Sequence, residues 1–391
     1  MTAEIAILNR NAVALAADSA VTVGNRRVWN NANKLFSLSP VNDIGIMIYG
    51  SGEFLGWSWE TIIKTFRQKN GDQVFPTVSE CGEDFLNYLK SDAFGNNTFN
   101  EEEMSFNSLF FEILESIKEE FEEKPKETEF SDFLSKKISD SSKLEKLDVD
   151  IIEWLEFEKR LFSQIEIITK KILKAPQSDN VMKHVLDLLF IVYSSKVRSK
   201  SATGFVISGF GSKQFSPELI DYTLDGKIGE FLRVWKNTEV NLNVNPGAQI
   251  VPFAQTDMIQ LFMEGISGTN LFFIYNTLVR VLKDKSNQTE EEINKLLGDF
   301  LDEVKTFQQE KMISPVMNVI STLPKEEMAA MAEALVEITS LRRKVDSPLE
   351  TVGGPTDVAV ISKGDGLIWI KRKHYFDINL NHDFLQRKKL I

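Results

Sequence analysis

The first fifty residues contain four short apolar runs, and this pattern restricts the fold more than any other feature of the sequence. Runs 3–9 and 12–17 are separated by a polar turn, as in a β-hairpin, and runs 34–38 and 44–49 form a second pair. Runs as apolar as these indicate strands that are buried on both faces, or central strands of a sheet that helices cover. We therefore expect the chain to begin with strands inside a layered domain.

The rest of the chain alternates between helical and strand patterns. Helical spacing begins after Gly52, and from about residue 83 to 200 apolar residues recur at helical spacing among Glu and Lys. Strand character returns at 203–211 and 218–229, where Asp225-Gly226 is a strong turn signal. Helices are expected from about 255 to 343, and the runs TDVAVISKG and GLIWIKRK predict a last strand pair.

This order of strands, helices, strands, helices and strands predicts an α+β fold. We expect a single domain over residues 1–391, with a core formed by 2–82 and 201–376 and a helical insertion at about 83–200. The chain shows no internal repeat and no low-complexity linker.

Composition excludes several classes of protein. The 391 residues are 42% hydrophobic and 26% charged, as in globular proteins, and the net charge of −12 argues against a nucleic-acid partner. No apolar run approaches the roughly 20 residues of a membrane span, and the start lacks the pattern of a signal peptide, so the expected location is the cytoplasm. The single cysteine, Cys81, fits a reducing compartment.

Metal and cofactor chemistry has little support in the sequence. The three histidines, His184, His374 and His382, lack metal-ligand spacing relative to one another and to Cys81. The glycine pairs lack the spacing and the lysine of a phosphate loop, and a G-x-S-x-G motif is absent. We therefore expect neither a metal ion nor an organic cofactor.

The N-terminus offers a different chemistry. Methionine is usually removed when a small residue follows it, so Thr2 is expected to become the first residue of the mature chain. A threonine with a free α-amine holds a nucleophile and a base in one residue, because an amine with a pKa near 7.7–8.0 can accept the hydroxyl proton near neutral pH.

Three further segments supply groups that such a nucleophile needs. Lys34 begins an apolar run and Asp18 ends another, and two buried charges at these places would pair beside Thr2. The turn Gly50-Ser51-Gly52 can present backbone N–H groups to an oxyanion. Each feature also has an ordinary structural interpretation, namely a turn or helix cap at Asp18, a surface lysine at Lys34 and a plain turn at Gly50.

In combination these segments resemble the N-terminal region of a proteasome β-subunit. The mature start of that family is similar to MTAEIAILNRNAVALAADSAVT, its lysine strand to NKLFSL, and its strand-to-helix turn to IMIYGSGEFLGWSWE. Weaker similarity extends over about residues 203–265 and 350–376. The resemblance implies a four-layer αββα sandwich of the N-terminal nucleophile (Ntn) hydrolase type, enlarged by the helical insertion.

The resemblance also implies roles for individual residues. Thr2, Asp18, Lys34 and Gly50 match the catalytic positions, and Thr22 and Ser51 match positions that bind substrate. The sequence departs from the family at a central serine, for which Thr256 or Asp257 could substitute. It also departs at an Asp…Ser pair before Gly353-Gly354, for which Glu350 or Thr351 could compensate.

The function that the resemblance implies is hydrolysis of an amide bond through an acyl-enzyme on Thr2, with a peptide or protein as substrate. Further copies of the chain and an unfoldase are implied as partners. Three alternatives stay open: a small-molecule amidase on the same scaffold, a non-catalytic structural subunit, and a binding platform in which the insertion recruits a partner.

Overall fold

The computed structural model describes residues 3–23, 27–29, 31–38, 41–91, 99–120, 127–149, 151–173, 178–228, 231–242, 247–285, 289–346, 353–374, 376–377, 380–381, 383 and 386.

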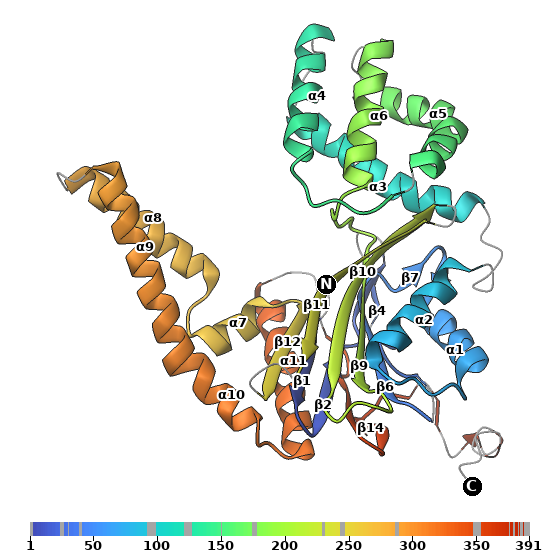
Figure 1. The fold of residues 1–391 in the computed structure, drawn as a ribbon, viewed down its shortest axis with the longest axis vertical. Coiled ribbons are helices and arrows are strands. Elements are labelled where there is room, and N and C mark those ends of the chain that lie inside the picture. Colours follow the sequence, from blue (N-terminus) through green and yellow to red (C-terminus); the bar gives the residue numbers. More distant parts are fainter. Residues whose placement is uncertain are drawn as a thin grey trace.

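Two five-stranded antiparallel sheets form the centre of the molecule (Figure 1). The first sheet contains, in spatial order, β12 (Ala248–Ala254), β1 (Ala3–Asn9), β2 (Ala12–Ala17), β13 (Asp357–Ser362) and β14 (Gly366–Lys371). The second sheet contains β11 (Phe231–Asn241), β10 (Glu218–Ile228), β9 (Thr203–Phe210), β6 (Asp43–Gly50) and β5 (Leu35–Ser37). Two small hairpins pair β3 (Val21–Val23) with β4 (Arg27–Trp29), and β7 (Glu53–Phe54) with β8 (Trp57–Ser58).

The strands of the first sheet are buried on both faces, as the apolar runs predict. In β1, Ile5 and Ile7 pack against helices, whereas Ala6 and Leu8 pack into the space between the two sheets. The helices on this face are α7 (Asp257–Glu264), α10 (Ser314–Ile320) and α11 (Lys325–Asp346). Because successive side chains of a strand point to opposite faces, one apolar run serves both cores.

The outer face of the second sheet is covered by α1 (Trp59–Asn70) and α2 (Val78–Lys90). Helix α1 begins at Trp59 because the hydroxyl of Ser58 accepts the N–H of Thr61, and its residues Trp59, Ile62, Ile63 and Phe66 form one buried stripe. The layers are therefore helix, sheet, sheet and helix. The expected α+β fold with antiparallel sheets and many helices is confirmed.

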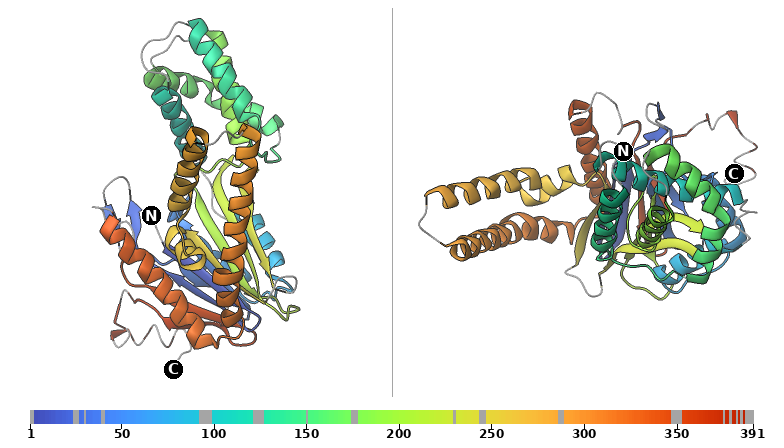
Figure 2. Two further views of the ribbon diagram at one scale, coloured as in Figure 1. Left: turned by 90° about the vertical axis from the view of Figure 1, so that its left-hand side faces the viewer. Right: turned by 90° about the horizontal axis from the view of Figure 1, so that it is seen from above.

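Four helices between α2 and β9 form a bundle above the sheets (Figures 1 and 2). They are α3 (Phe99–Glu120), α4 (Glu127–Ser141), α5 (Ile151–Leu173) and α6 (Asp179–Tyr193). The bundle has its own apolar core, to which Ile228 of β10 and Phe231 of β11 also belong. Helix α2 packs on the second sheet, so this separate core begins at α3. The domain bounds expected from the sequence, with an insertion at about 83–200, stay a prediction.

A second group of helices extends sideways from the sheets (Figures 1 and 2). Helices α8 (Gly268–Lys285) and α9 (Glu290–Phe307) form this arm, and α9 continues through a π-helical segment, η2 (Gln308–Ile313), into α10. Phe272 and Phe273 on α8 are 66% and 70% exposed. Among the described residues, no helix is sufficiently long and apolar to cross a lipid bilayer.

The expected turn at Asp225-Gly226 is wrong. Strand β10 continues through both residues to Ile228, and its register with β11 shifts between Leu224 and Lys227, with Gly226 at a φ of 104°. The glycine therefore forms an irregularity inside a strand rather than a hairpin turn. Asp225 is held there by hydrogen bonds from Ser199 and an ion pair with Arg233.

The helix expected directly after Gly52 begins later. The β7–β8 hairpin occupies residues 53–58, and its turn contains Leu55 and Gly56, both with positive φ. The side chain of Trp59 then anchors the helix start, because its Nε1–H donates to the hydroxyl of Thr203 at 3.0 Å.

Candidate active site at the start of the first strand

A buried lysine lies between two carboxylates at the start of β1. The ammonium nitrogen of Lys34 is 2.5 Å from Asp18 Oδ1 and 2.9 Å from Glu4 Oε1. Asp18 and Glu4 are each 1% exposed and Lys34 is 3% exposed, so all three groups are removed from water. Charged groups in such a place are stable only when they are paired, which this arrangement provides.

Asp18 connects three segments that are far apart in the sequence. Its Oδ1 accepts the backbone N–H of Ala3 at 3.1 Å as well as the Lys34 ammonium group, and its Oδ2 accepts the N–H of Gly353 at 2.9 Å. Its own N–H donates to the carbonyl of Ala3 at 3.0 Å. The carboxylate thus fixes the start of β1, the lysine and the Gly-Gly segment relative to one another.

Gly50 ends β6 with a φ of 84°, a conformation that favours glycine. A Cβ atom at this position would lie 2.7 Å from the carbonyl oxygen of Ala202 and 3.0 Å from Nη2 of Arg198. The next N–H, that of Ser51, donates to the Ala202 carbonyl at 3.3 Å. The hydroxyl of Ser51 lies 3.0 Å from the carbonyl of Glu53, so it holds the turn itself.

Other predicted site residues lie outside these contacts. Thr2, Glu350 and Thr351 lie outside the described residues, and so does the side chain of Thr22, whose backbone belongs to β3. The roles assigned to these residues, and those of Asp18, Lys34, Gly50 and Ser51, stay predictions.

A cavity of about 430 Å³ opens between the two sheets beside these groups. It is lined by residues from β6, β10, β11 and β12 and by Lys196 and Arg198 from the segment after α6. Ala254, which lines it, is the register partner of Ala3 in the β1–β12 pair. Since Arg198 also lies against Gly50, the cavity, hereafter the inter-sheet cavity, lies between the start of β1 and the end of β6.

The interior of the inter-sheet cavity contains a hydrogen-bonded carboxylate. The hydroxyl of Tyr49 donates to Asp221, with oxygen distances of 2.9 and 3.0 Å, and Asn237 Nδ2 donates to Asp221 at 3.0 Å. Burial raises the pKa of Asp221 to about 6. Burial and the neighbouring Asp221 carboxylate also raise the pKa of Tyr49, so that its hydroxyl stays a hydrogen-bond donor.

The end of β12 has an unusual backbone and a buried amide. Ala254 has a φ of 61°, in the left-handed region that costs a non-glycine residue roughly 1–3 kcal/mol. The next residue, Gln255, is 7% exposed, and its Oε1 has no hydrogen-bond partner within the part of the chain that the structure describes. Such strain and such buried polar atoms are typical of functional sites.

The two residues expected to replace the family's central serine differ in their surroundings. Thr256 lines the inter-sheet cavity, and its hydroxyl makes no cap hydrogen bond to α7. The carboxylate of Asp257 instead pairs with Arg343 of α11 at 3.0 Å. Of these two residues, Thr256 is therefore the one that lies at the cavity.

The remaining reactive side chains lie elsewhere. Cys81 lies on the buried face of α2, and burial raises the pKa of its thiol. His184 on α6 contacts the hydroxyl of Ser131 at 3.2 Å. No group of three or more His, Cys, Asp or Glu side chains that could hold a metal ion occurs among the described residues.

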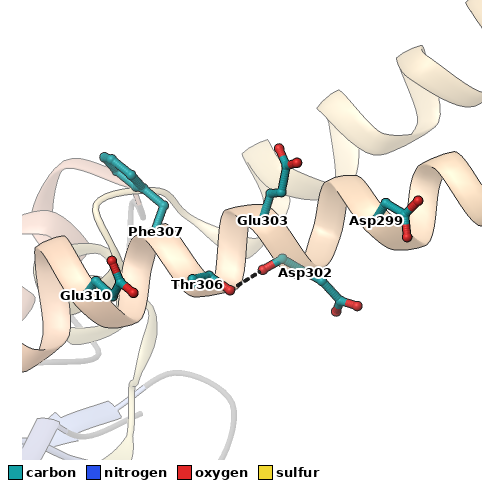
Figure 3. A pocket seen from close by; sticks show the side chains of 6 residues that line it. All are labelled: Asp299, Asp302, Glu303, Thr306, Phe307 and Glu310. Carbon is teal, nitrogen blue, oxygen red and sulfur yellow. Dashed lines mark hydrogen bonds between the residues drawn. The ribbon is translucent and has the colours of Figure 1, made fainter.

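A second hollow, of about 560 Å³, lies on the arm (Figure 3). Its lining comes from one continuous helical stretch and consists of Asp299, Asp302, Glu303, Thr306, Phe307 and Glu310. It is an acidic helix surface that contains none of the predicted site residues.

Sequence reasoning missed Glu4 and most of the inter-sheet cavity. Glu4 had a detectable signal, because it is a charged residue inside an apolar run, on the strand face that Ala6 and Leu8 share. Asp221 had a similar signal within β10. Arg198 had none, since it lies in a loop whose position depends on contacts between distant segments.

Comparisons with known proteins give no sequence relative. No protein-family model and no curated protein sequence matches the chain. Among solved structures, it is similar over 99% of its length to Anbu (ancestral beta-subunit) from Yersinia bercovieri, with 94% of that chain covered, 7% identity and a TM-score of 0.31.

Two further solved structures give similar values. For Anbu from Hyphomicrobium sp. strain MC1, the similarity covers 99% of this chain and 94% of that chain, with 10% identity and a TM-score of 0.30. For the helical assembly of the Anbu complex from Pseudomonas aeruginosa, it covers 99% and 96%, with 11% identity and a TM-score of 0.31. TM-scores this low indicate only a distant structural likeness.

Proposed function

We propose that the chain is an Ntn hydrolase of the proteasome β-subunit type, with a four-layer αββα sandwich, that cleaves amide bonds with Thr2 as nucleophile. The observation that carries the proposal is the hydrogen bond from the N–H of Ala3 to Asp18, which also binds Lys34. Consecutive Cα atoms lie about 3.8 Å apart, so the residue before Ala3 is close to this pair by covalent geometry. The expected substrate is a peptide.

The proposed reaction has two steps. The Thr2 hydroxyl attacks the amide carbonyl carbon while the Thr2 α-amine takes the hydroxyl proton and then passes a proton to the leaving amine, which gives an ester on Thr2. A water molecule, deprotonated by the same α-amine, attacks the ester carbonyl carbon; the bond to the Thr2 oxygen then breaks, that oxygen takes the proton from the amine, and the carboxylic acid product leaves. The backbone N–H of Gly50 is proposed to stabilise the oxyanion in both steps.

Lys34 has two carboxylate partners, whereas the sequence indicates only Asp18. Its ammonium group contacts the carboxyl groups of both Asp18 and Glu4, so it is not an isolated cation. In the proposal, Asp18 and Glu4 hold Lys34 in place, and Lys34 donates a hydrogen bond towards the Thr2 hydroxyl. Gln255, with its buried Oε1, is proposed to accept a hydrogen bond from the α-amine.

The size of the inter-sheet cavity favours one of the alternatives as a second candidate. About 430 Å³ is within the range of pockets for small ligands, so a small-molecule amidase on the same residues is also proposed. Self-assembly and delivery of substrates by an unfoldase stay predictions from the resemblance.

The deciding experiment is the intact mass of the purified protein before and after treatment with an epoxyketone or a β-lactone, reagents that trap an N-terminal threonine. We expect loss of Met1 and addition of one inhibitor molecule per chain. The variant Thr2→Ala should fold normally and gain no mass from the inhibitor, whereas Thr2→Ser should keep the reaction.

A retained Met1, or a free Thr2 that never reacts, would overturn the enzymatic proposal and favour the structural subunit. Hydrolysis that persists in Thr2→Ala would overturn the assigned nucleophile. If the adduct forms, cleavage of peptides compared with cleavage of amino-acid amides separates the peptidase from the amidase.

A further inference from the structure

The rim of the inter-sheet cavity carries an arginine next to the candidate oxyanion turn. Nη2 of Arg198 lies 3.0 Å from the position that a Cβ atom on Gly50 would take. The guanidinium carbon of Arg198 lies 5.1 Å from the ring centre of Tyr49, a cation–π distance. Any substrate whose carbonyl reaches Gly50 must therefore pass within reach of this guanidinium group.

The ring of Tyr49 is itself held in one place. It lies across Gly204 of β9, where a Cβ atom would be 1.9 Å from the ring carbon Cζ, so a side chain at this position would displace the ring. The hydroxyl end of Tyr49 is fixed by Asp221. The aromatic surface beneath Arg198 is thus rigid.

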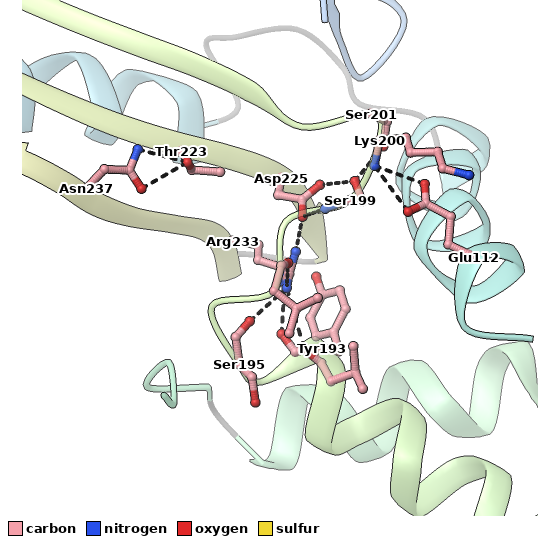
Figure 4. A network of polar contacts seen from close by, with 12 residues as sticks. Glu112, Tyr193, Ser195, Ser199, Lys200, Ser201, Thr223, Asp225, Arg233 and Asn237 are labelled. Carbon is pink, nitrogen blue, oxygen red and sulfur yellow. Dashed lines mark hydrogen bonds and ion pairs between the residues drawn. The ribbon is translucent and has the colours of Figure 1, made fainter. Parts of the chain in front are cut away.

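The backbone on both sides of Arg198 is also fixed, by a buried arginine on β11 (Figure 4). Arg233 is 0% exposed, and it donates to the carbonyls of Tyr193 at 2.9 Å, Ser195 at 2.8 Å and Val197 at 2.5 Å. It also pairs with Asp225, whose carboxylate accepts the N–H of Ser199 at 2.9 Å. Val197 and Ser199 flank Arg198, so the arginine is presented from a preorganised segment.

The other charges around the inter-sheet cavity already have partners. Asp221 accepts hydrogen bonds from Tyr49 and Asn237, and Lys196 pairs with Glu145 of the bundle segment. Arg198 is exposed, and although its charge acts on Asp221 and on the Tyr49 hydroxyl, it forms no close ion pair with a carboxylate of the described residues. It is therefore the lining cation that remains available to an anion from outside.

We propose that Arg198 binds a carboxylate of the substrate close to the scissile amide, so that the preferred substrates are amides with an acidic group. The planar guanidinium group can donate two parallel hydrogen bonds to a carboxylate. The acidic group is either an Asp or Glu side chain or the C-terminal carboxylate of a short substrate. The inference rests on the proposed function, because it takes the inter-sheet cavity to be the substrate site.

The test measures binding rather than turnover, with the full chain carrying Thr2→Ala so that the probes stay intact. Isothermal titration compares two pairs of tetrapeptides: one with Glu or Gln at one internal position and amidated ends, and one neutral peptide with a free or an amidated C-terminus. We expect one acidic probe to bind roughly tenfold or more tightly than its neutral partner, as a charge-assisted hydrogen bond provides. The pair that shows the preference identifies the source of the carboxylate.

The variant Arg198→Gln should bind acidic and neutral probes equally, and Arg198→Lys should recover only part of the preference because an ammonium group cannot bind bidentately. Lys200→Gln, two residues away in the same segment, is the matched control and should keep the full preference. Equal affinities of acidic and neutral probes, no binding of either acidic probe, or a preference that survives Arg198→Gln would each overturn the inference.

These outcomes are independent of the test of the nucleophile. An inhibitor adduct on Thr2 without a charge preference would leave the hydrolase standing and remove the role of Arg198. A charge preference that depends on Arg198, without an adduct, would establish a carboxylate site in a chain that is not a threonine hydrolase.

Discussion

At the start of β1, one buried ammonium group pairs with two buried carboxylates. Lys34 has an ordinary appearance in the sequence, but its removal would leave Glu4 and Asp18 as like charges inside the core. Leaving a buried charge without its partner costs far more than losing an exposed ion pair. The stability of this corner of the sheet therefore depends on the lysine, apart from any role in catalysis.

We predict that Lys34→Met lowers the free energy of unfolding by roughly 3–5 kcal/mol, the range for a broken buried pair. The second change Glu4→Gln should restore part of this loss in the double variant, because only one stranded carboxylate remains. Urea unfolding of the single and double variants, followed by tryptophan fluorescence, measures the coupling.

Lys64→Met is the matched control for this cycle. Lys64 pairs with Glu60 on α1, where the two side chains are 48% and 35% exposed, so its loss should cost less than about 1 kcal/mol. Strictly additive effects of Glu4→Gln and Lys34→Met would contradict a shared buried cluster.

The raised pKa of Asp221 predicts that the free energy of unfolding depends on pH. Burial raises its pKa from 3.8 to about 6, so between these values the folded state binds more protons than the unfolded state. Stability must then fall as pH rises from about 4 to 6, and the penalty stays constant at higher pH. Asp221→Asn, which cannot ionise, should gain up to about 3 kcal/mol relative to the parent between pH 4 and 7, since each pKa unit is about 1.4 kcal/mol.

Urea unfolding of both proteins at pH 4, 5, 6 and 7 measures this difference. Asparagine keeps one acceptor oxygen and replaces the other with an NH2 group, so a constant difference reflects the hydrogen bonds to Tyr49 and Asn237, whereas the pH-dependent part reflects the charge. A difference between the two proteins that is flat across this range, or that falls with rising pH, would contradict the raised pKa.

At the scale of elements, the sequence predicted those strands and helices whose pattern is local. The apolar runs of β1, β2 and β6 and the buried stripe of α1 can be seen without any knowledge of the fold. The hairpins β3–β4 and β7–β8 were not expected, since their strands have two or three residues and no periodicity. Strands β11 and β12 were also not expected. Residues 236–239 of β11 are polar and exposed, and β12 contains Pro252, which is unusual within a strand.

The residues of the candidate site also divide into those that a local sequence pattern indicates and those that it does not. The pair of Asp18 and Lys34 was expected because each is a charge at the end of an apolar run, and the structure brings the two side chains into contact. The hydrogen bonds of Arg233 and the position of Arg198 could not be expected, because they depend on contacts between β10, β11 and the end of α6. At Asp225-Gly226 a local turn signal was overridden by those contacts, which hold Asp225 inside the strand.

At the scale of the whole molecule, the β10–β11 hairpin links two apolar cores that otherwise have separate members. Leu224 and Leu232 belong to the core under α1 and α2, whereas Ile228 and Phe231, at the tip, belong to the core of the α3–α6 bundle. The segment with Arg198 runs beside this tip and is bonded to β11 through Arg233. The bundle should therefore influence the rim of the inter-sheet cavity while leaving the first sheet unaffected.

Hydrogen exchange can test this coupling with the variant Phe110→Ala. Phe110 is 0% exposed in the bundle core, so the truncation should destabilise the bundle by roughly 3–5 kcal/mol. Exchange measured by mass spectrometry should rise in α3–α6, at the tip of β10 and in residues 193–199, with no change in β1, β2 and β13. The matched control Phe66→Ala, at an equally buried position on α1, should instead raise exchange in α1, α2 and the second sheet. A uniform rise along the chain in both variants would mean that bundle and sheets unfold as one unit, and that the bundle has no separate influence on Arg198.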